Sequence, residues 1–178
     1  IYSGNMGVAQ DLDAFVELAF RLRHRADIGF LMIGRGSELA RLRGVAQKQG
    51  LDNLLIEDQV SQIELAGLLA HCHAAIVALH PAHGTHNIPG KLLTYLQAGL
   101  PVLARVNPGN DLHHLVLEEG IGASVVGPSL EALGDAAEWL ADRPGARRDM
   151  GSRGRALSDR IFSPAAAAEQ VVRGLSAR

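Results

Sequence analysis

The stretch of the sequence from Ala74 to Ala104 reads AAIVALHPAHGTHNIPGKLLTYLQAGLPVLA. It opens with a short apolar run, Ala74–Leu79, and closes with another, Pro101–Ala104. Between the two runs lie a polar loop and the segment Lys91–Ala98, which we expect to form a helix. A strand, a helix and a second strand in this order predict a βαβ unit with parallel strands.

The same alternation extends over the rest of the chain. Four further apolar runs are predicted as strands, and they are Ile1–Ser3, Ile28–Ile33, Leu54–Ile56 and Ala123–Val126. Apolar residues recur every three to four positions in segments 12–22 and 130–141, as in helices with one buried face. From about Arg143 onward we expect helices only, the last beginning at Ser163 and Pro164 and ending near Leu175. We therefore predict one α/β domain, a doubly wound, Rossmann-like parallel sheet of about six strands with helices on both faces.

Composition and charge exclude several classes of protein. Of the 178 residues, 47% are hydrophobic and 20% are charged, as in a globular domain. The net charge of −2 gives no basic excess for binding a nucleic-acid backbone. The single cysteine, Cys72, excludes an internal disulfide and fits a reducing compartment, and no apolar run approaches the roughly 20 residues of a membrane span. We therefore expect a cytoplasmic protein that does not bind nucleic acid.

The beginning of the chain bears on its domain organisation. Ile1 is not a start methionine, and the sequence enters its first predicted strand at once. The first strand of a doubly wound sheet lies near the middle of the sheet. We therefore expect an upstream portion to precede it.

The loops after the first and fourth strands are the strongest candidates for a binding site, because ligands of open α/β sheets bind where the strand order reverses. After the first strand, Gly4 and Gly7 permit close backbone approach, and the next helix offers free N–H groups to an anion. The loop after the fourth strand ends in Pro89-Gly90-Lys91. A lysine at a helix start adds its charge to the positive end of the helix dipole. A bound diphosphate would offset both positive charges. The alternative is an ordinary solvated lysine.

Other residues carry weaker signals. Arg35 and Arg105 lie just past the second and fifth strands, where each could face a phosphate or solvent. Cys72 is expected to have a packing role. Trp139 is expected on the buried side of its helix or beside it, as a core residue rather than a stacking platform. Three histidines of one loop are spaced like metal ligands, but a loop does not hold them on one face and no carboxylate lies among them; they are His80, His83 and His86. We therefore expect polar contacts with a ligand, and no metal site.

Three motifs together resemble one family. They are Tyr2-Ser3-Gly4-Asn5-Met6-Gly7, Ile33-Gly34-Arg35-Gly36-Ser37-Glu38 and, above all, the segment Pro89–Ala104 with its Ala-Gly-x-Pro-Val. The chain resembles the C-terminal, donor-binding domain of retaining glycosyltransferases with two Rossmann domains. The bacterial O-antigen and lipopolysaccharide enzymes that transfer N-acetylated amino sugars are the most similar branch. The likeness covers residues 1–178 and implies an N-terminal acceptor domain outside this chain.

The resemblance implies a nucleotide-diphosphate sugar as donor, generally a UDP-sugar, and a glycan or lipid-linked acceptor held by the other domain. It also implies that no metal or other cofactor is required, that the whole enzyme could associate peripherally with the inner face of the cytoplasmic membrane, and that this chain alone transfers little sugar. Lys91 and His86 would be the catalytic residues, Lys91 by stabilising the departing nucleoside diphosphate. The residues implied in donor binding are Gly4, Asn5, Gly7, Gln10, Arg35, Gln59, Val60, His83, Gly84, Asn87, Gly90 and Thr94.

The sequence departs from the usual pattern of this family. Two glutamates eight residues apart are replaced by His86 and Thr94, and a threonine cannot hold both ribose hydroxyls as a carboxylate can. Asn5 and Gln10 stand where the family usually has Arg and Lys. Lys91 would therefore carry more of the phosphate charge.

Two alternatives remain open from the sequence. A nucleotide-sugar 2-epimerase would have the same fold, but it needs carboxylates for proton abstraction, and the central loops offer histidines instead. A non-catalytic nucleotide- or metal-binding module would use the same loops without a reaction.

Overall fold

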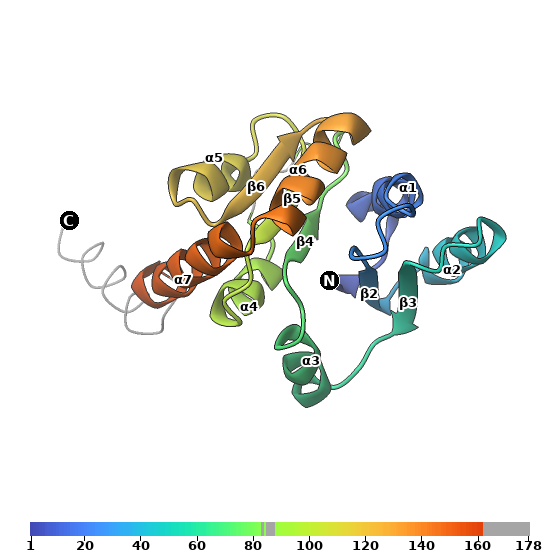
Figure 1. Cartoon of the computed structure of the whole chain (residues 1–178), viewed down its shortest axis with the longest axis horizontal. Helices are drawn as coiled ribbons and strands as arrows, with labels where there is room; N and C mark the ends of the chain where they lie inside the picture. The colour runs from blue at the N-terminus through green and yellow to red at the C-terminus, as the bar shows by residue number, and fades with distance from the viewer. Residues whose placement is uncertain (83, 85–87, 162–178) are drawn as a thin grey trace.

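A computed structural model of the chain describes residues 1–82, 84 and 88–161, in which strands and helices alternate (Figure 1). The strands are β1 (Tyr2–Asn5), β2 (Phe30–Arg35), β3 (Leu54–Asp58), β4 (Ala75–Ala78), β5 (Val102–Val106) and β6 (Gly122–Val126). The helices are the 3-10 turn η1 (Val8–Gln10), α1 (Asp13–Arg21), α2 (Leu39–Lys48), α3 (Gln62–Leu69), α4 (Lys91–Gln97), α5 (Asp111–Glu118), α6 (Leu130–Asp142) and α7 (Pro144–Ile161). Every predicted strand coincides with an observed one to within a few residues. The helix predicted from Ser163 to Leu175 lies outside the described residues.

The strands form two parallel sheets that meet edge to edge. One sheet has the order β1-β2-β3 and the other β4-β5-β6, and every pairing is parallel. The two sheets meet where the backbone N–H of Ile76 in β4 donates to the carbonyl of Ile1, at 2.7 Å. The first strand therefore lies in the middle of the six, as the crossover rule predicts.

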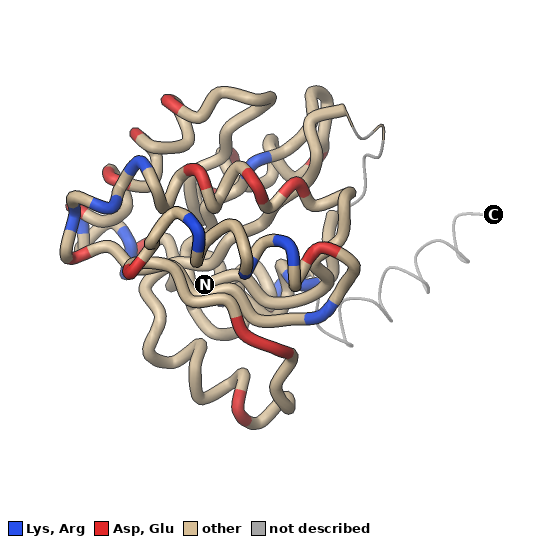
Figure 2. Tube along the Cα trace, turned by 90° about the vertical axis from the view of Figure 1, so that its right-hand side faces the viewer, with Lys and Arg blue, Asp and Glu red and all other residues tan. Residues whose placement is uncertain are grey.

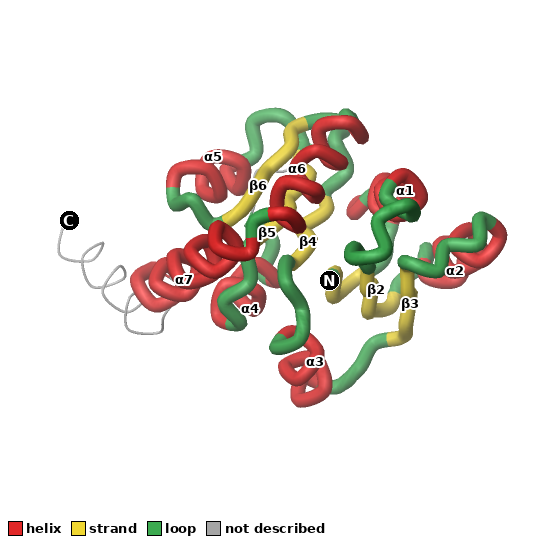
Figure 3. Tube along the Cα trace, in the orientation of Figure 1, coloured by secondary structure: helices red, strands yellow, loops and turns green. Residues whose placement is uncertain are grey.

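Helices cover both faces, because alternate strand residues point into two separate cores (Figure 3). In β4 the side chains of Ile76 and Ala78 join the core beneath α1, α2 and α6. Those of Ala75 and Val77 join the core beneath α4, α5 and α7. The doubly wound α/β architecture is confirmed.

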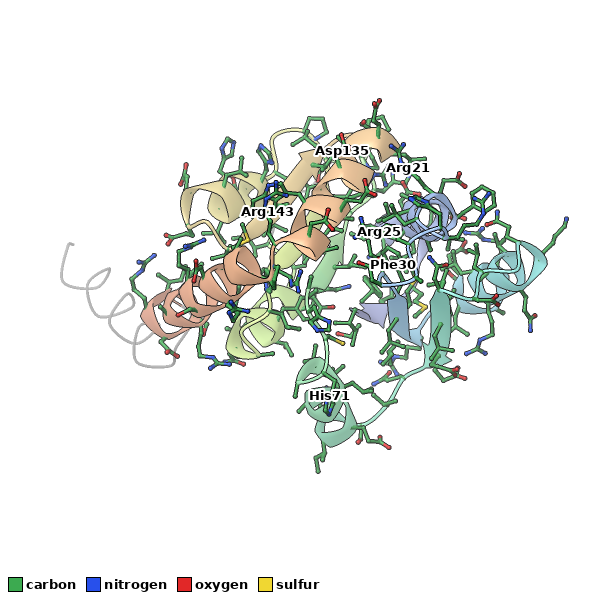
Figure 4. The ribbon with its side chains drawn as sticks, in the orientation of Figure 1. Arg21, Arg25, Phe30, His71, Asp135 and Arg143 are labelled. Atoms are coloured by element: carbon green, nitrogen blue, oxygen red, sulfur yellow. The ribbon has the colours of Figure 1, made fainter. Side chains whose placement is uncertain are left out.

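On one face, α1 and α6 span the junction of the two sheets. Arg25, in the loop after α1, forms ion pairs with Asp27, Glu138 and Asp142, the last at 2.6 Å. Figure 4 shows Arg21 and Arg25 on the α1 side, close to α6. Trp139 of α6 is 37% exposed beneath the guanidinium of Arg143. The prediction of a core role for this tryptophan is wrong, because the ring lies beside the buried stripe of α6.

Acidic and basic residues are interspersed over the surface rather than gathered in a basic stripe (Figure 2). Among the described residues, no helix combines the length and apolar character needed to cross a bilayer.

Candidate donor-binding site

A cavity of about 370 Å³ opens at the carboxyl ends of the first three strands, beside the start of α4. It is lined by Ser3, Gly4, Asn5, Ile33, Gly34, Arg35, Gln59, Val60, Gln62, Leu65, Lys91 and Thr94. The loop after β1, the loop after β3 and the first turn of α4 thus converge on one space. No carboxylate lies among these lining residues.

The glycine-rich loop brings bare backbone to this cavity. Gly4 has a φ of 133°, which an L side chain rarely adopts, and a Cβ there would lie 3.2 Å from Nζ of Lys91. The loop is closed by Gln10, whose Oε1 accepts hydrogen bonds from Nδ2 of Asn5 and from the backbone N–H of Gly7, both at 3.0 Å. The amide of Gly7 is therefore engaged inside the loop, while Gly4 and Asn5 face the cavity.

Gly34 and Gly36, at the end of β2, pack against the glycine-rich loop that follows β1. A Cβ on Gly34 would overlap the carbonyl oxygen of Gly4, and one on Gly36 would overlap the backbone of Met6. Met6 in turn donates to the carbonyl of Arg35 at 2.7 Å and accepts from the N–H of Glu38 at 2.9 Å. These glycines allow the two loops to pack backbone against backbone.

Lys91 is one of two cations that line the cavity, and the other is the exposed Arg35. Lys91 is the first residue of α4, and its Nζ lies 3.8 Å from the centroid of the Tyr2 ring. Burial lowers the pKa of its ammonium to about 8. Among the described residues it pairs with no carboxylate, so its charge is available to an anion.

The buried hydroxyl of Tyr95 holds α4 against β1. It accepts a hydrogen bond from the backbone N–H of Ser3 at 2.8 Å, and it lies 3.1 Å from the Ser3 hydroxyl. Tyr95 is fully buried, and desolvation raises its pKa. Because Tyr95 follows Lys91 by one helical turn, this contact fixes the distance between the lysine and the glycine-rich loop.

On the opposite wall, Gln59 and Val60 precede α3. Ser61 caps that helix in a capping box: its Oγ accepts from the N–H of Glu64 at 3.3 Å, and the Glu64 carboxylate accepts from the Ser61 N–H at 2.9 Å. The cap fixes where the chain turns, and therefore where the two residues before it face the cavity.

The structure brings together seven of the residues that the resemblance implied. Those lining the cavity are Gly4, Asn5, Arg35, Gln59, Val60, Lys91 and Thr94. Gly7 and Gln10 shape the loop from behind it, and Gly90 precedes Lys91 at the exposed start of the helix. Gly84 is exposed, and no atom of the described residues lies within 4 Å of where a Cβ would be. His83, His86 and Asn87 lie outside the described residues, so their roles stay predictions.

Two residues that sequence reasoning missed organise the site, and they are Tyr2 and Tyr95. Tyr95 lies four positions after Lys91, on the same face of the helix. Tyr2 and Tyr95 are the two tyrosines of the sequence. The signal that could have identified Tyr95 was its position one helical turn after Lys91, the lysine predicted to bind a phosphate.

Two further expectations are resolved by the structure. Arg105 does not line the cavity beside Lys91, because it is 4% exposed and its NH1 lies 2.6 Å from Oδ2 of Asp11. Cys72 is half-buried against the core, and burial raises the pKa of its thiol.

Within the described part of the chain, no group of three or more His, Cys, Asp or Glu could hold a metal ion.

The fold is that of the C-terminal domains of two-Rossmann-domain glycosyltransferases. The C-terminal domain of the group 1 glycosyl transferase LpcC from Francisella tularensis matches with a TM-score of 0.70 at 16% identity, covering 92% of this chain and 86% of that one. Anabaena Alr3699/HepE, solved with UDP-glucose, matches with a TM-score of 0.79 at 12% identity, over 99% of this chain and 49% of that one. WaaG, a glycosyltransferase involved in lipopolysaccharide biosynthesis, matches with a TM-score of 0.67 at 20% identity, over 89% of this chain and 42% of that one.

The sequence also shows the family. The family described as "Glycosyl transferases group 1" matches residues 1–143, and the chain belongs to it. A relative from Escherichia coli (strain K12), named "Putative colanic acid biosynthesis glycosyl transferase WcaI", is 33% identical over 136 residues, or 75% of this chain. The chain spans 33% of the length of that relative.

Proposed function

We propose that this chain is the donor-binding domain of a retaining glycosyltransferase, which holds a nucleotide-diphosphate sugar for transfer to a lipopolysaccharide or O-antigen acceptor. The observation that carries the proposal is the cavity in which the bare backbone at Gly4, the ammonium of Lys91 and the loop at Gln59 and Val60 converge. Membership of the group 1 family and the UDP-glucose complex of HepE support a nucleotide sugar as the ligand. A UDP-N-acetylamino sugar is the donor we favour.

The chemistry follows from the charges. As the bond between the sugar carbon and the phosphate oxygen breaks, its electron pair stays on the phosphate, and negative charge develops beside Lys91. The ammonium and the N–H groups of the loop supply the positive potential for which other enzymes use a metal ion. We therefore propose a metal-independent reaction. His86 is proposed as the second catalytic residue, at the donor sugar.

The 2-epimerase alternative is not favoured. That reaction needs carboxylates for proton transfer, and none lines the described part of the cavity. The family to which the chain belongs also supports transfer rather than epimerisation.

Calorimetric titration with UDP-, GDP- and TDP-sugars, in the presence of a chelator, tests the proposal. We expect at least one of these ligands to bind, and Lys91→Ala to weaken it. Lys48→Ala is the matched control, because Lys48 is the other lysine of the chain and lies exposed at the end of α2. Absence of binding by every nucleotide diphosphate, or binding that responds to Lys48 rather than Lys91, would contradict the proposal.

A further inference from the structure

Asp11 occupies an unusual position at the end of the glycine-rich loop. It terminates η1 with a φ of 46°, and it is the one non-glycine residue among those described that has a positive φ. Aspartate tolerates the left-handed region better than most residues, yet glycine is the residue that adopts it without strain. The side chain at this position therefore needs a reason other than the turn itself.

The reason is an ion pair with Arg105. NH1 of Arg105, in β5, lies 2.6 Å from Oδ2 of Asp11, and the arginine side chain is 5% exposed. Its buried Nε has no hydrogen-bond partner among the described residues. The buried guanidinium depends strongly on this carboxylate, because removal of Asp11 would leave its charge buried without compensation.

Backbone hydrogen bonds also connect Arg105 to the glycine-rich loop. The backbone carbonyl of Arg105 accepts from the N–H of Leu79 at 2.9 Å, and the next residue, His80, donates to the carbonyl of Ala9 at 2.9 Å. Ala9 belongs to η1, which Asp11 terminates by donating to Val8 at 3.2 Å. Arg105 thus reaches η1 twice, through its side chain and through the end of β4.

From η1 the restraint passes to the part of the loop that faces the cavity. Gln10, directly before Asp11, accepts hydrogen bonds from both Asn5 and Gly7. A shift of Asp11 would move Gln10, and Gln10 determines where the backbone from residue 5 to residue 7 lies. The charged pair itself faces a different cavity, of about 310 Å³, away from Lys91.

We propose that the ion pair between Asp11 and Arg105 positions the glycine-rich loop for the diphosphate, so that both residues act on the donor through the loop without touching it. The proposal rests on the proposed function for its ligand and on the contacts above for its geometry. It assigns to Arg105 a role that its place at the end of a strand did not reveal.

The test uses Asp11→Asn and Arg105→Gln, with two readouts. The first is the affinity for UDP compared with that for uridine, which lacks the diphosphate. We expect the Kd for UDP to rise by about tenfold in each variant and the Kd for uridine to stay within about twofold. The second is amide hydrogen exchange of residues 5–10 without nucleotide, which we expect to become faster in both variants. An unchanged exchange rate in the loop, or an equal loss of UDP and uridine binding, would overturn the proposal.

Three further variants separate positioning from stability. Asp11→Gly relieves the left-handed backbone while removing the carboxylate, so it should fold and still lose UDP affinity, even if Arg105→Gln does not fold. Val116→Ala, in the core beneath α5, lowers stability at a distance from the loop and should leave UDP affinity unchanged. Arg160→Gln removes a surface ion pair with Glu119 of the same 2.6 Å length and should also leave it unchanged. If the unaltered protein binds no nucleoside diphosphate at all, the proposed function fails, whereas loop exchange still decides the role of the pair.

Discussion

Nζ of Lys91 lies 3.8 Å from the centroid of the Tyr2 ring, so this buried cation of the cavity is held by an aromatic face, and no carboxylate of the described residues pairs with it. A carboxylate would neutralise the lysine before any ligand arrived. The ring attracts the ammonium more weakly, by about 0.5–2 kcal/mol depending on exposure. Lys91 therefore stays in place while its charge remains free to meet a diphosphate.

The pH dependence of donor binding should follow Lys91. Burial lowers its pKa to about 8 in the folded protein, below that in the unfolded chain. Between these two pKa values the unfolded chain binds more protons, so this group makes folding more favourable as the pH rises. Binding of an anion becomes weaker as the pH rises, because it needs the protonated ammonium of Lys91. We expect the affinity for UDP to fall by about tenfold between about pH 7 and pH 9, measured by calorimetry. Lys91→Arg, which stays charged, should give a flat profile, and a wild-type profile just as flat would contradict this assignment.

Two substitutions at Tyr2 should separate the ring from its hydroxyl. The hydroxyl donates to the backbone carbonyl of Asn5. Tyr2→Phe should lower the free energy of unfolding in urea by about 1 kcal/mol and leave the pH midpoint of UDP binding near that of the wild type. Tyr2→Leu removes the aromatic face as well, so the midpoint should move to lower pH. An identical midpoint in Tyr2→Leu would show that the ring does not support the cation.

Gly4→Ala should impair both folding and binding. A Cβ at Gly4 meets a φ of 133° and lies 3.2 Å from Nζ of Lys91. Gly127 is the matched control, because its φ of 85° is also positive and no atom of the described residues lies within 4 Å of its Cβ position. Both substitutions should cost about 1–3 kcal/mol of backbone strain, but only Gly4→Ala should weaken UDP binding. Equal affinity in the two variants would show that the approach of Gly4 to Lys91 is not needed.

Alanine substitutions at two helical glycines should change the free energy of unfolding in opposite directions. A Cβ on Gly151 of α7 would overlap the carbonyl oxygen of Gly99, in the Ala-Gly-x-Pro-Val motif, whereas Gly44 of α2 has nothing within 4 Å. Gly44→Ala should raise the free energy of unfolding by about 1 kcal/mol. Gly151→Ala should lower it by more than that, because α7 must move away from the end of α4. Denaturant titration of both variants checks the signs, and a stabilised Gly151→Ala would refute the close packing.

Sequence patterns predicted the architecture well, for a physical reason. Strands buried on both faces must be almost wholly apolar, as Ala75–Ala78 is, and helices that cover them must repeat every three to four residues. Trp139 shows the limit of this reasoning, because a residue at the border of an apolar stripe can lie on either side of it. The division of the six strands into two sheets of three was also not visible in the sequence.

The sequence by itself determined that this is a doubly wound α/β domain and that glycine-rich loops and Lys91 lie at one edge of its sheet, since both follow from local periodicity and strand direction. Only the tertiary structure decided which side chains meet there. Tyr2 lies under Lys91, Tyr95 binds Ser3, and Arg105 pairs with Asp11 across 94 positions of the chain. These contacts depend on how the strands are ordered and how deeply each cation is buried, and neither property is encoded in any short segment.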